Sequence, residues 1–333
     1  MIGYIVRRIV AGILVLFATS IAIFALFFYG PSDPAQASCP ETKCTAARLD
    51  QIRENLGLDQ PVVQQYGTYV KGIFVGRDIA SGALSYDCHA PCLGVSFKQG
   101  LPVTPYLLDR FPATLSIALG AAAVFLTVGV ATGIYAARRR GKTSDKVVVG
   151  LSLVVNAIPP YLLFLMSYLY LISATQILPE SGYVSPFSGG LHVVAWASGM
   201  LAAWLTLGLS QATAYARFSR GSMVEVLNED YVRTARAKGL SDRRVTFKHG
   251  LRAALVPVVT IFGLDFAFLL SGTIFAEWIF GIEGIGITAL RATRDADLPL
   301  ISATVLIAAT FIVAANIVVD IVYSLLDPRV RLA

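Results

Sequence analysis

The sequence predicts an all-α membrane protein, a polytopic helical bundle with about six transmembrane helices. Of its 333 residues, 56% are hydrophobic and only 14% are charged, whereas a soluble domain carries about 25% charged residues. Six stretches with at most one charge each exceed the roughly 20 residues that cross a bilayer as a helix. Backbone polar groups in hydrocarbon need partners within their own segment, so these stretches are predicted to be helices and not strands.

The six predicted spans follow one another along the chain. They cover residues 9–29, 113–137, 147–179, 189–216, 253–276 and 298–326. The third is too long for one straight helix, and Pro159-Pro160 is predicted to kink it because proline breaks the helical hydrogen-bond pattern. The first is longer than the apolar core of about 7–15 residues in a signal peptide, so we expect it to be retained.

The distribution of basic residues predicts the orientation. Eighteen of the 27 Lys and Arg fall at the two termini, between spans 2 and 3 and in the 217–252 loop, and nine fall on the opposite side. The positive-inside rule therefore predicts that both termini and the 217–252 loop are cytoplasmic. Because topology explains the net charge of +6, no nucleic-acid partner is expected.

The sequence predicts an N-terminal transmembrane helix (1–30), an external cap (31–110) and a five-helix core (111–333). The cap is predicted to contain a short polar helix at 45–55 and an amphipathic helix at 65–74 on the membrane surface. All four cysteines lie in the cap: Cys39, Cys44, Cys88 and Cys92. This distribution favours one or two disulfides in an oxidising compartment, with three pairings open. A metal site that includes His89, or free thiols, are the alternatives.

No pattern in the chain is typical of an enzyme. The three histidines are far apart in sequence, and no metalloprotease or serine-hydrolase motif is present. Gly141-Lys142-Thr143 resembles the end of a phosphate-binding loop, but the required earlier glycine is replaced by Ala136. We therefore expect a non-catalytic chain without a bound metal or cofactor.

Two acidic residues lie inside the predicted spans. Asp265 is close to mid-membrane, where a carboxylate is costly, and no predicted span holds a Lys or Arg to pair with it. It is predicted to face a cavity; the alternative is a neutral, hydrogen-bonded Asp that packs helices together. Asp320, near the end of span 6, is interpreted as an interfacial or packing residue.

The 217–252 loop is the most informative segment. Residues 223–238 are predicted to form a helix with acidic residues first and basic residues last, which complements the helix dipole. Gly239 suits the end of that helix, and Ser241 suits the start of a second short helix at 242–252. We interpret the two predicted helices either as a solvated hairpin or as a projecting surface that binds a cytoplasmic partner. Its expected apolar contacts are Tyr231, Val232, Ala235 and Leu240.

The same loop carries a family resemblance. DYVRTARAKGL at 230–240 and HGLRAALVP at 249–257 resemble the EAA loop of binding-protein-dependent ABC importers, closest to the dipeptide/oligopeptide/nickel permease family. The resemblance continues through YIVRR at 4–8, PSDP at 31–34, LGLDQP at 56–61, RFPAT at 110–114, EWIF at 277–280, GIG at 284–286 and LDPRVR at 326–331. Three departures stand out: Arg233-Thr234-Ala235 replaces Glu-Ala-Ala, Ile282-Glu283-Gly284 replaces Trp-Pro-Gly, and the Cys-bearing stretches 38–45 and 86–93 look like insertions.

The resemblance implies a type I ABC importer permease in the bacterial cytoplasmic (inner) membrane, carrying short peptides. It implies a coupling helix seated in an ATPase subunit, formed by Glu229, Asp230, Tyr231, Val232, Arg233, Thr234, Ala235, Arg236, Ala237, Lys238, Gly239 and Leu240. It also implies an external gate at Glu277, Trp278, Phe280, Gly284 and Gly286.

The implied partners are a second homologous permease subunit, one or two cytoplasmic ATPase subunits that hold ATP and Mg, an extracytoplasmic peptide-binding protein and membrane lipid. Nickel is an alternative substrate within the family. A proton-coupled secondary transporter using Asp265 and Asp320 is the alternative from another class.

Overall fold

The computed structural model describes residues 2–29, 34–37, 45–55, 59–81, 84–187 and 189–326, and the chain divides into two compact units. Unit 1 comprises Ala113–Glu283 with the described residues after 314, and unit 2 comprises Ile2–Pro112 with Gly284–Ala314. Cys39 and Cys44 lie outside the described residues.

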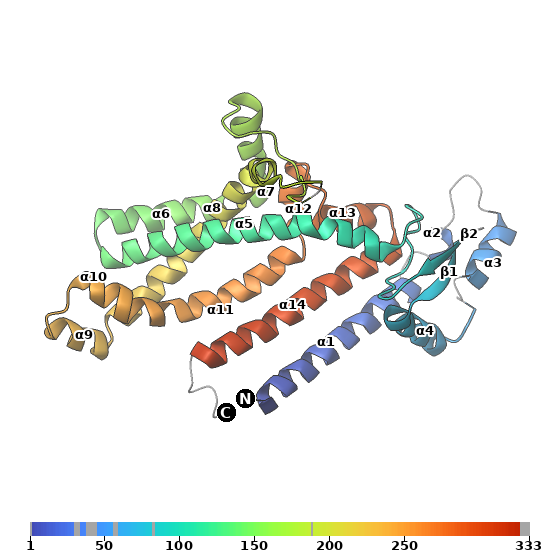
Figure 1. Cartoon of the computed structure of the whole chain (residues 1–333), viewed down its shortest axis with the longest axis horizontal. Coiled ribbons are helices and arrows are strands. Elements are labelled where there is room, and N and C mark those ends of the chain that lie inside the picture. Colours follow the sequence, from blue (N-terminus) through green and yellow to red (C-terminus); the bar gives the residue numbers. More distant parts are fainter. Residues whose placement is uncertain are drawn as a thin grey trace. The chain divides into compact units, whose positions relative to one another are not determined.

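The predicted helical membrane fold is confirmed. Among the described residues, five helices are long and apolar enough to span a membrane, and a bent helix pair raises the number to six. The five are α1 (Ile2–Tyr29), α5 (Val103–Arg138), α8 (Val193–Leu227), the continuous helix Asp242–Leu270 and α14 (Leu298–Leu326). Figure 1 shows these helices along the chain.

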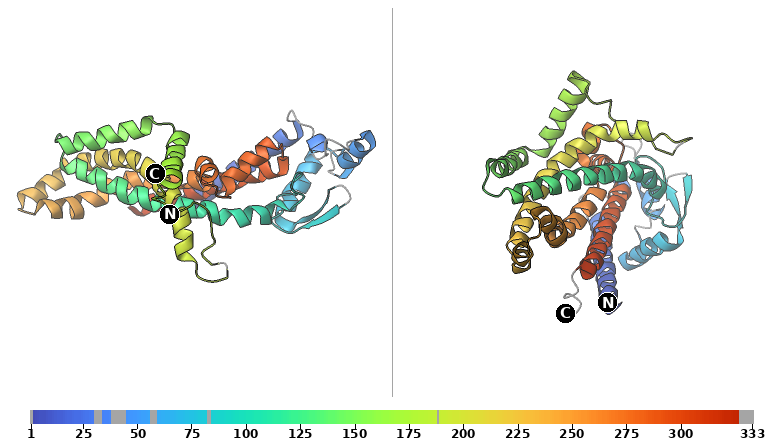
Figure 2. Two further views of the ribbon diagram at one scale, coloured as in Figure 1. Left: turned by 90° about the horizontal axis from the view of Figure 1, so that it is seen from above. Right: turned by 60° about the vertical axis from the view of Figure 1, so that its left-hand side comes forward.

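The predicted kink at Pro159-Pro160 is a complete break. α6 (Thr143–Ala157) and α7 (Pro160–Ser167), which continues into the π-helical turn η1 (Tyr168–Ala174), meet at 97°. Ile158 is extended (ψ 127°), because a residue before proline is disfavoured in the helical region. Figure 2 shows α7 and η1 leaving the direction of α6.

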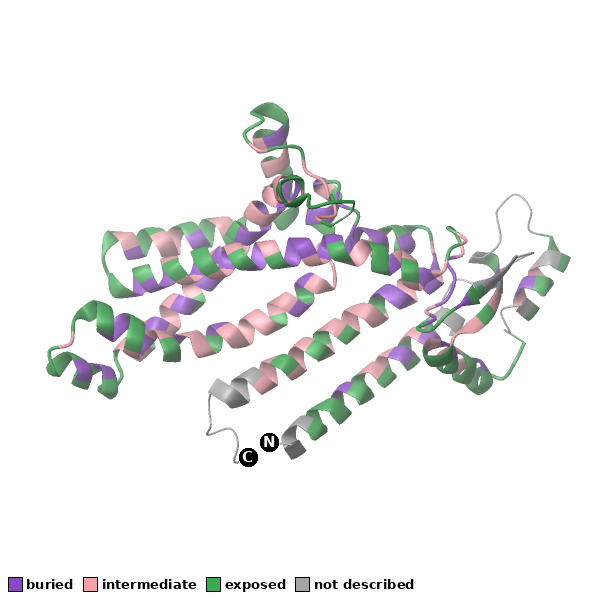
Figure 3. Cartoon of the chain, viewed as in Figure 1, coloured by how far each residue is buried: buried purple, intermediate pink, exposed green. Residues whose placement is uncertain are grey.

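Unit 1 is built around α8, which contacts both α6 and α11 (Leu251–Leu270). Small residues let its helices approach closely. A Cβ on Gly129 of α5 would lie 2.7 Å from the Cβ of Tyr215 and 2.8 Å from the carbonyl oxygen of Ala212, so only glycine permits this crossing. Phe125 and Tyr215 are fully enclosed there, with ring centroids 4.5 Å apart, and Figure 3 shows the buried residues along α5.

Unit 2 contains the predicted cap and adds a feature that the sequence did not predict. The helices expected at 45–55 and 65–74 are confirmed as α3 (Ala46–Asn55) and α4 (Val62–Val75). The addition is an antiparallel hairpin of β1 (Arg77–Ser81) and β2 (Leu84–Cys88), after which Cys88 forms a disulfide with Cys92. The other elements are α2 (Pro34–Ala37), α13 (Ile285–Arg294) and the first part of α14.

A buried carboxylate fixes the turn that follows the hairpin. Asp297 accepts hydrogen bonds from the Ser96 hydroxyl, from the Phe97 amide at 3.2 Å and from the Lys98 amide at 3.4 Å. It thereby joins the turn at 96–98 to the start of α14.

We predict that Asp297→Ala loosens this turn. Hydrogen bonds to a charged group contribute about 1.5–3 kcal/mol each, so the loss of three acceptor contacts is expected to destabilise the segment by about 3 kcal/mol or more. Hydrogen exchange of the amides at 94–103 would accelerate by at least tenfold. Asp295→Ala, at an exposed aspartate two residues earlier, is the control and is expected to leave exchange unchanged; equal acceleration in both variants would contradict the assignment.

Candidate functional site

The 217–252 loop contains one short separate helix, α9 (Asp230–Ala237). The single helix predicted over 223–238 is wrong, because α8 continues to Leu227 and the chain breaks at Asn228 and Glu229. The Asn228 side-chain amide donates to the Val224 carbonyl at 2.9 Å, and Glu229 is extended (ψ 148°). Asparagine competes for backbone hydrogen bonds in this way, which ends helices.

The short second helix predicted at 242–252 is also wrong. α10 (Asp242–Arg244), the π-helical turn η2 (Val245–Gly250) and α11 form one continuous helix to Leu270. Gly250 does not end it, because its backbone stays helical (φ −89°, ψ −46°). A Cβ on Gly250 would lie 3.0 Å from the Met223 side chain, so this glycine serves close packing.

α9 packs on an apolar cluster, here called the foot and defined as Val232, Ala235 and Val245 with Leu227 and Leu240 packed against them. Val232 is 0% exposed. Val232 and Ala235 therefore hold α9 against its own loop, and their expected contact with a partner stays a prediction. The sequence periodicity alone could not distinguish the two faces, since both carry small or apolar residues.

The opposite face of α9 is open. Tyr231 is 47% exposed, and most other residues of the predicted coupling segment are exposed with it: Glu229, Asp230, Arg233, Thr234, Arg236, Ala237, Lys238 and Gly239. Partial burial, and then the charge of Glu229, raise the pKa of Tyr231, so its hydroxyl stays neutral. Gly239 has φ +79°, which a glycine adopts without strain and which ends the helix.

Ion pairs tie α9 to the rest of unit 1. Asp242 pairs with Arg138 of α5 at 3.0 Å and with Arg236 of α9 at 3.7 Å. Nearby, Asp145 of α6 forms a two-pronged pair with Arg220 of α8, with Oδ1–Nε at 2.5 Å and Oδ2–Nη2 at 2.8 Å. The first pair of contacts joins the start of the Asp242–Leu270 helix to α5 and α9. The second joins the start of α6 to α8.

The segment Gly141-Lys142-Thr143 belongs to the same region. The Gly141 amide donates to Asp145 Oδ2 at 2.9 Å, and this hydrogen bond closes the turn between α5 and α6. The sequence interpretation of this segment as a basic turn agrees with that contact.

Asp265 has a partner that sequence reasoning missed. The Tyr215 hydroxyl of α8 donates to Asp265 Oδ2 on α11 at 2.8 Å. Asp265 is half-buried. The sequence shows only that no Lys or Arg lies in the predicted spans, and a neutral tyrosine hydroxyl can also donate to a carboxylate. Asp320, on α14, is also half-buried.

The predicted gate residues divide between buried and exposed positions. Glu277 of α12 (Ile274–Ile279) is 1% exposed and accepts from the Thr114 hydroxyl at 2.9 Å. Phe280 is also buried, and its carbonyl accepts from the Ser181 hydroxyl at 2.9 Å. Trp278 is 54% exposed and, with Phe280, lines a cavity of about 820 Å³ formed with η1 and residues 176–181. In unit 2, Gly284 precedes α13 and Gly286 lies buried in its first turn.

Comparison with known proteins identifies the family. Residues 129–332 match the family described as "Binding-protein-dependent transport system inner membrane component", and residues 1–118 match its N-terminal companion. The chain belongs to this family. The permease is thus a multi-pass membrane component of a transport system that depends on a binding protein.

Curated relatives match the permease from end to end. It is 33% identical to a probable peptide ABC transporter permease of Sinorhizobium fredii, over 98% of this chain and 99% of the relative. It is 34% identical to a putative peptide transport system permease of Brucella abortus and 33% identical to the dipeptide transport system permease DppB of Escherichia coli K12, each over 99% of both chains.

Proposed function

We propose that the permease imports short peptides as the non-catalytic membrane-spanning subunit of an ATP-driven transporter. Three curated relatives that match it over nearly their whole length are named as peptide or dipeptide permeases. In this proposal ATP and Mg are held by separate ATPase subunits, and the permease supplies half of the translocation pathway.

The observation that carries the mechanism is the two-sided construction of α9. A helix of eight residues is too short to be stable on its own, yet its apolar foot and the Asp242–Arg236 pair hold it in place. The open face with Tyr231 and Arg233 is then available to an ATPase subunit as a rigid body. Movement of α9 would reach α8 and α11 directly, since both are continuous with the loop on either side.

The remaining assembly follows from this role. A second homologous permease chain would complete the pathway, one or two ATPase subunits would bind on the cytoplasmic side, and an extracytoplasmic peptide-binding protein would deliver the substrate. Both termini and the 217–252 loop are assigned to the cytoplasm, and Trp278 and Phe280, with Gly284 and Gly286, to the external gate. Unit 2 residues 31–110 would form the external cap.

The two alternatives have less support. A nickel carrier would require clustered soft or imidazole ligands along the spans, and the predicted spans contain no cluster of His, Cys or Met. A proton-coupled transporter using Asp265 and Asp320 gains nothing from the end-to-end similarity to ABC permeases.

Co-purification from the native host tests the proposal. The tagged permease, extracted in mild detergent, is expected to bring down an ATPase subunit with a phosphate-binding loop and a second six-span chain. Cells lacking the permease are expected to lose ATP-dependent peptide uptake. A solitary chain that supports uptake driven by a proton gradient would overturn the proposal and favour the carrier alternative.

The pair of Tyr215 and Asp265 provides a test of the pathway. If Asp265 holds the α-amino group of a peptide, Asp265→Asn is expected to lower the apparent affinity for uptake by about tenfold or more, because charge-assisted bonds are about twice as strong as neutral ones. Tyr215→Phe keeps the carboxylate but removes its 2.8 Å donor, and is expected to lower affinity less. An Asp265→Asn transporter with the parental rate and affinity would make Asp265 a packing residue.

A further inference from the structure

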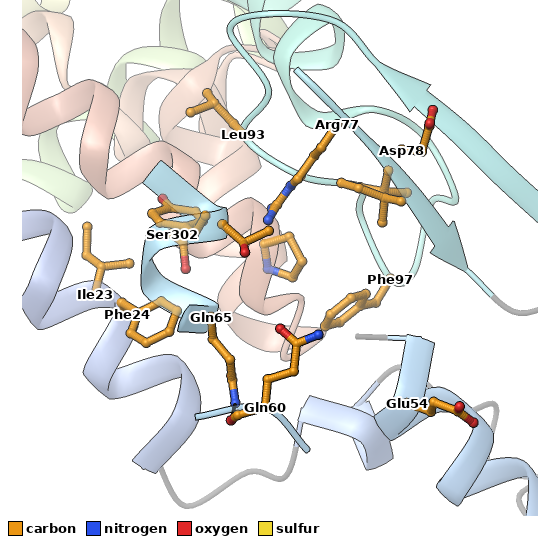
Figure 4. A pocket seen from close by; sticks show the side chains of 16 residues that line it. Ile23, Phe24, Glu54, Gln60, Gln65, Arg77, Asp78, Leu93, Phe97 and Ser302 are labelled. Atoms are coloured by element: carbon orange, nitrogen blue, oxygen red, sulfur yellow. Dashed lines mark hydrogen bonds between the residues drawn. The ribbon is translucent and has the colours of Figure 1, made fainter. Parts of the chain in front are cut away.

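Unit 2 contains a partly open cavity of about 300 Å³ that none of the functions above uses. Its wall is formed by residues of α1, α3, α4, β1, the segment 93–97 and the start of α14. The volume is at the lower end of the range of small-molecule sites, about 300–1,000 Å³. Figure 4 shows the side chains that line it.

Arg77, the first residue of β1, extends into this cavity. Its aliphatic stem lies across Gly72, where a Cβ would come within 2.7 Å of Arg77 Cδ, and its guanidinium lies 5.7 Å from the centre of the Tyr69 ring. Glycine at position 72 and the ring of Tyr69 thus hold the side chain in one direction. Figure 4 shows the guanidinium pointing toward the middle of the lining residues.

No counter-charge meets this guanidinium in the described part of the chain. The Arg77 side chain forms no ion pair or hydrogen bond there, and its Nε is buried without a partner. Burial lowers the pKa of Arg77 from its ordinary value. In contrast, Arg138, Arg220 and Arg236 each pair with an aspartate. A cation removed from water without a partner is costly, and an anionic ligand would offset that cost.

The charge around the cavity is arranged in two layers. Glu54 and Asp78 also line it, but both are exposed, and Figure 4 shows their carboxylates directed away from Arg77. The inner position is therefore positive and the rim is negative. The rings of Phe24 and Phe97 also line the cavity and offer an apolar surface.

We propose that this cavity binds the C-terminal end of a short peptide. The planar carboxylate would pair with the fork of Arg77, the last side chain would lie against Phe24 and Phe97, and the acidic rim would attract the α-ammonium group. The acidic rim repels a simple anion such as phosphate, which favours a zwitterion. This inference rests on the proposed function, because a peptide bound in the cap is a substrate awaiting transfer to the membrane pathway.

Binding of one peptide in two chemical forms tests the assignment without any mutation. The full chain, in a neutral detergent and phosphate-free buffer, would be titrated with Ala-Phe and with Ala-Phe amide by isothermal calorimetry. The amide is expected to bind at least tenfold more weakly, since it lacks the carboxylate. Equal affinities for acid and amide would overturn the proposal, as would competition by inorganic phosphate at the concentration at which Ala-Phe binds.

Variants then assign the effect to Arg77. Arg77→Gln is expected to lower the affinity for Ala-Phe to that for the amide and to leave the affinity for the amide unchanged. Arg77→Lys, which keeps the charge, is expected to restore part of the difference. Lys71→Gln is the matched control, because Lys71 is an exposed cation on the neighbouring helix α4, and it should bind like the parent. An acid preference that persists in Arg77→Gln would overturn the assignment.

Peptide uptake separates this inference from the proposed function. If cells need the permease for Ala-Phe uptake but Arg77→Gln leaves the affinity for Ala-Phe unchanged, only the site in the cap is wrong. If uptake does not depend on the permease at all, the proposed function fails, and the site in the cap fails with it.

Discussion

Replacing Val232 by Asp is expected to abolish peptide uptake by detaching α9 from its foot. Val232 is 0% exposed and packs with Ala235 and Val245. An unpaired carboxylate in that position carries an effective penalty of several kcal/mol, far more than an eight-residue helix can absorb. We therefore expect α9 to unfold locally while the membrane helices remain inserted.

Hydrogen exchange distinguishes this local unfolding from loss of the docking surface. In Val232→Asp, the amides of residues 230–237 are expected to exchange at the rate of an unstructured segment, and the ATPase subunit should no longer co-purify. Val232→Ala, which removes two methyl groups, is expected to give an intermediate result. Normal uptake by Val232→Asp would show that α9 does not transmit the ATPase cycle.

Tyr231→Ala is the complementary variant on the open face of the same helix. Because Tyr231 is 47% exposed, its loss is expected to leave exchange of 230–237 unchanged and to weaken only the association with the ATPase subunit. Fast exchange of 230–237 in Val232→Asp, together with normal exchange in Tyr231→Ala, would establish that α9 has one packed face and one open face. Fast exchange in Tyr231→Ala would instead assign that ring to the foot.

Hydropathy and charge were sufficient to predict the helical membrane fold. The break at Pro159-Pro160 was also predictable, because proline acts locally through its missing amide. The ends of the spans were not: the prediction ended span 4 at 216, whereas α8 continues to Leu227. The hydrophobic run ends at Arg217 and Arg220. The backbone hydrogen bonds of a helix do not depend on hydropathy, so α8 continues past these charged residues beyond the membrane.

Long-range polar pairs were the main omission. The contacts of Tyr215 with Asp265 and of Thr114 with Glu277 join residues 50 and 163 positions apart. Sequence periodicity assigns a face to each residue but does not say which helices meet. The hairpin β1–β2 was missed for a related reason, since its pairing of Arg77 with Cys88 depends on a tertiary context that short alternating runs do not reveal.

Separating Asp145 from Arg220 is expected to cause the largest loss of stability in unit 1. The Asp145 side chain is 5% exposed and that of Arg220 is 28% exposed. Removing one member of a buried pair typically costs about 3–5 kcal/mol, because the other charge is left without a partner. Arg220→Ala should cost more than Asp145→Ala, since the carboxylate is the more enclosed of the two charges. Among the described residues it would keep the hydrogen bond from the Gly141 amide and the weaker attraction of Arg140.

The double variant Asp145→Leu with Arg220→Met decides whether the pair itself is needed. Replacing a buried ion pair by apolar residues is often neutral or stabilising, so the thermal midpoint in detergent is expected to return close to that of the parent. Arg233→Ala, which breaks an exposed pair with Asp230 at 3.7 Å, is the control and should cost about 0–1 kcal/mol. If the double variant is as unstable as Arg220→Ala, the geometry of the two-pronged pair, and not the burial of charge, holds α6 against α8. If it recovers stability but not uptake, the same pair positions the start of α6 for transport while the helices pack without it.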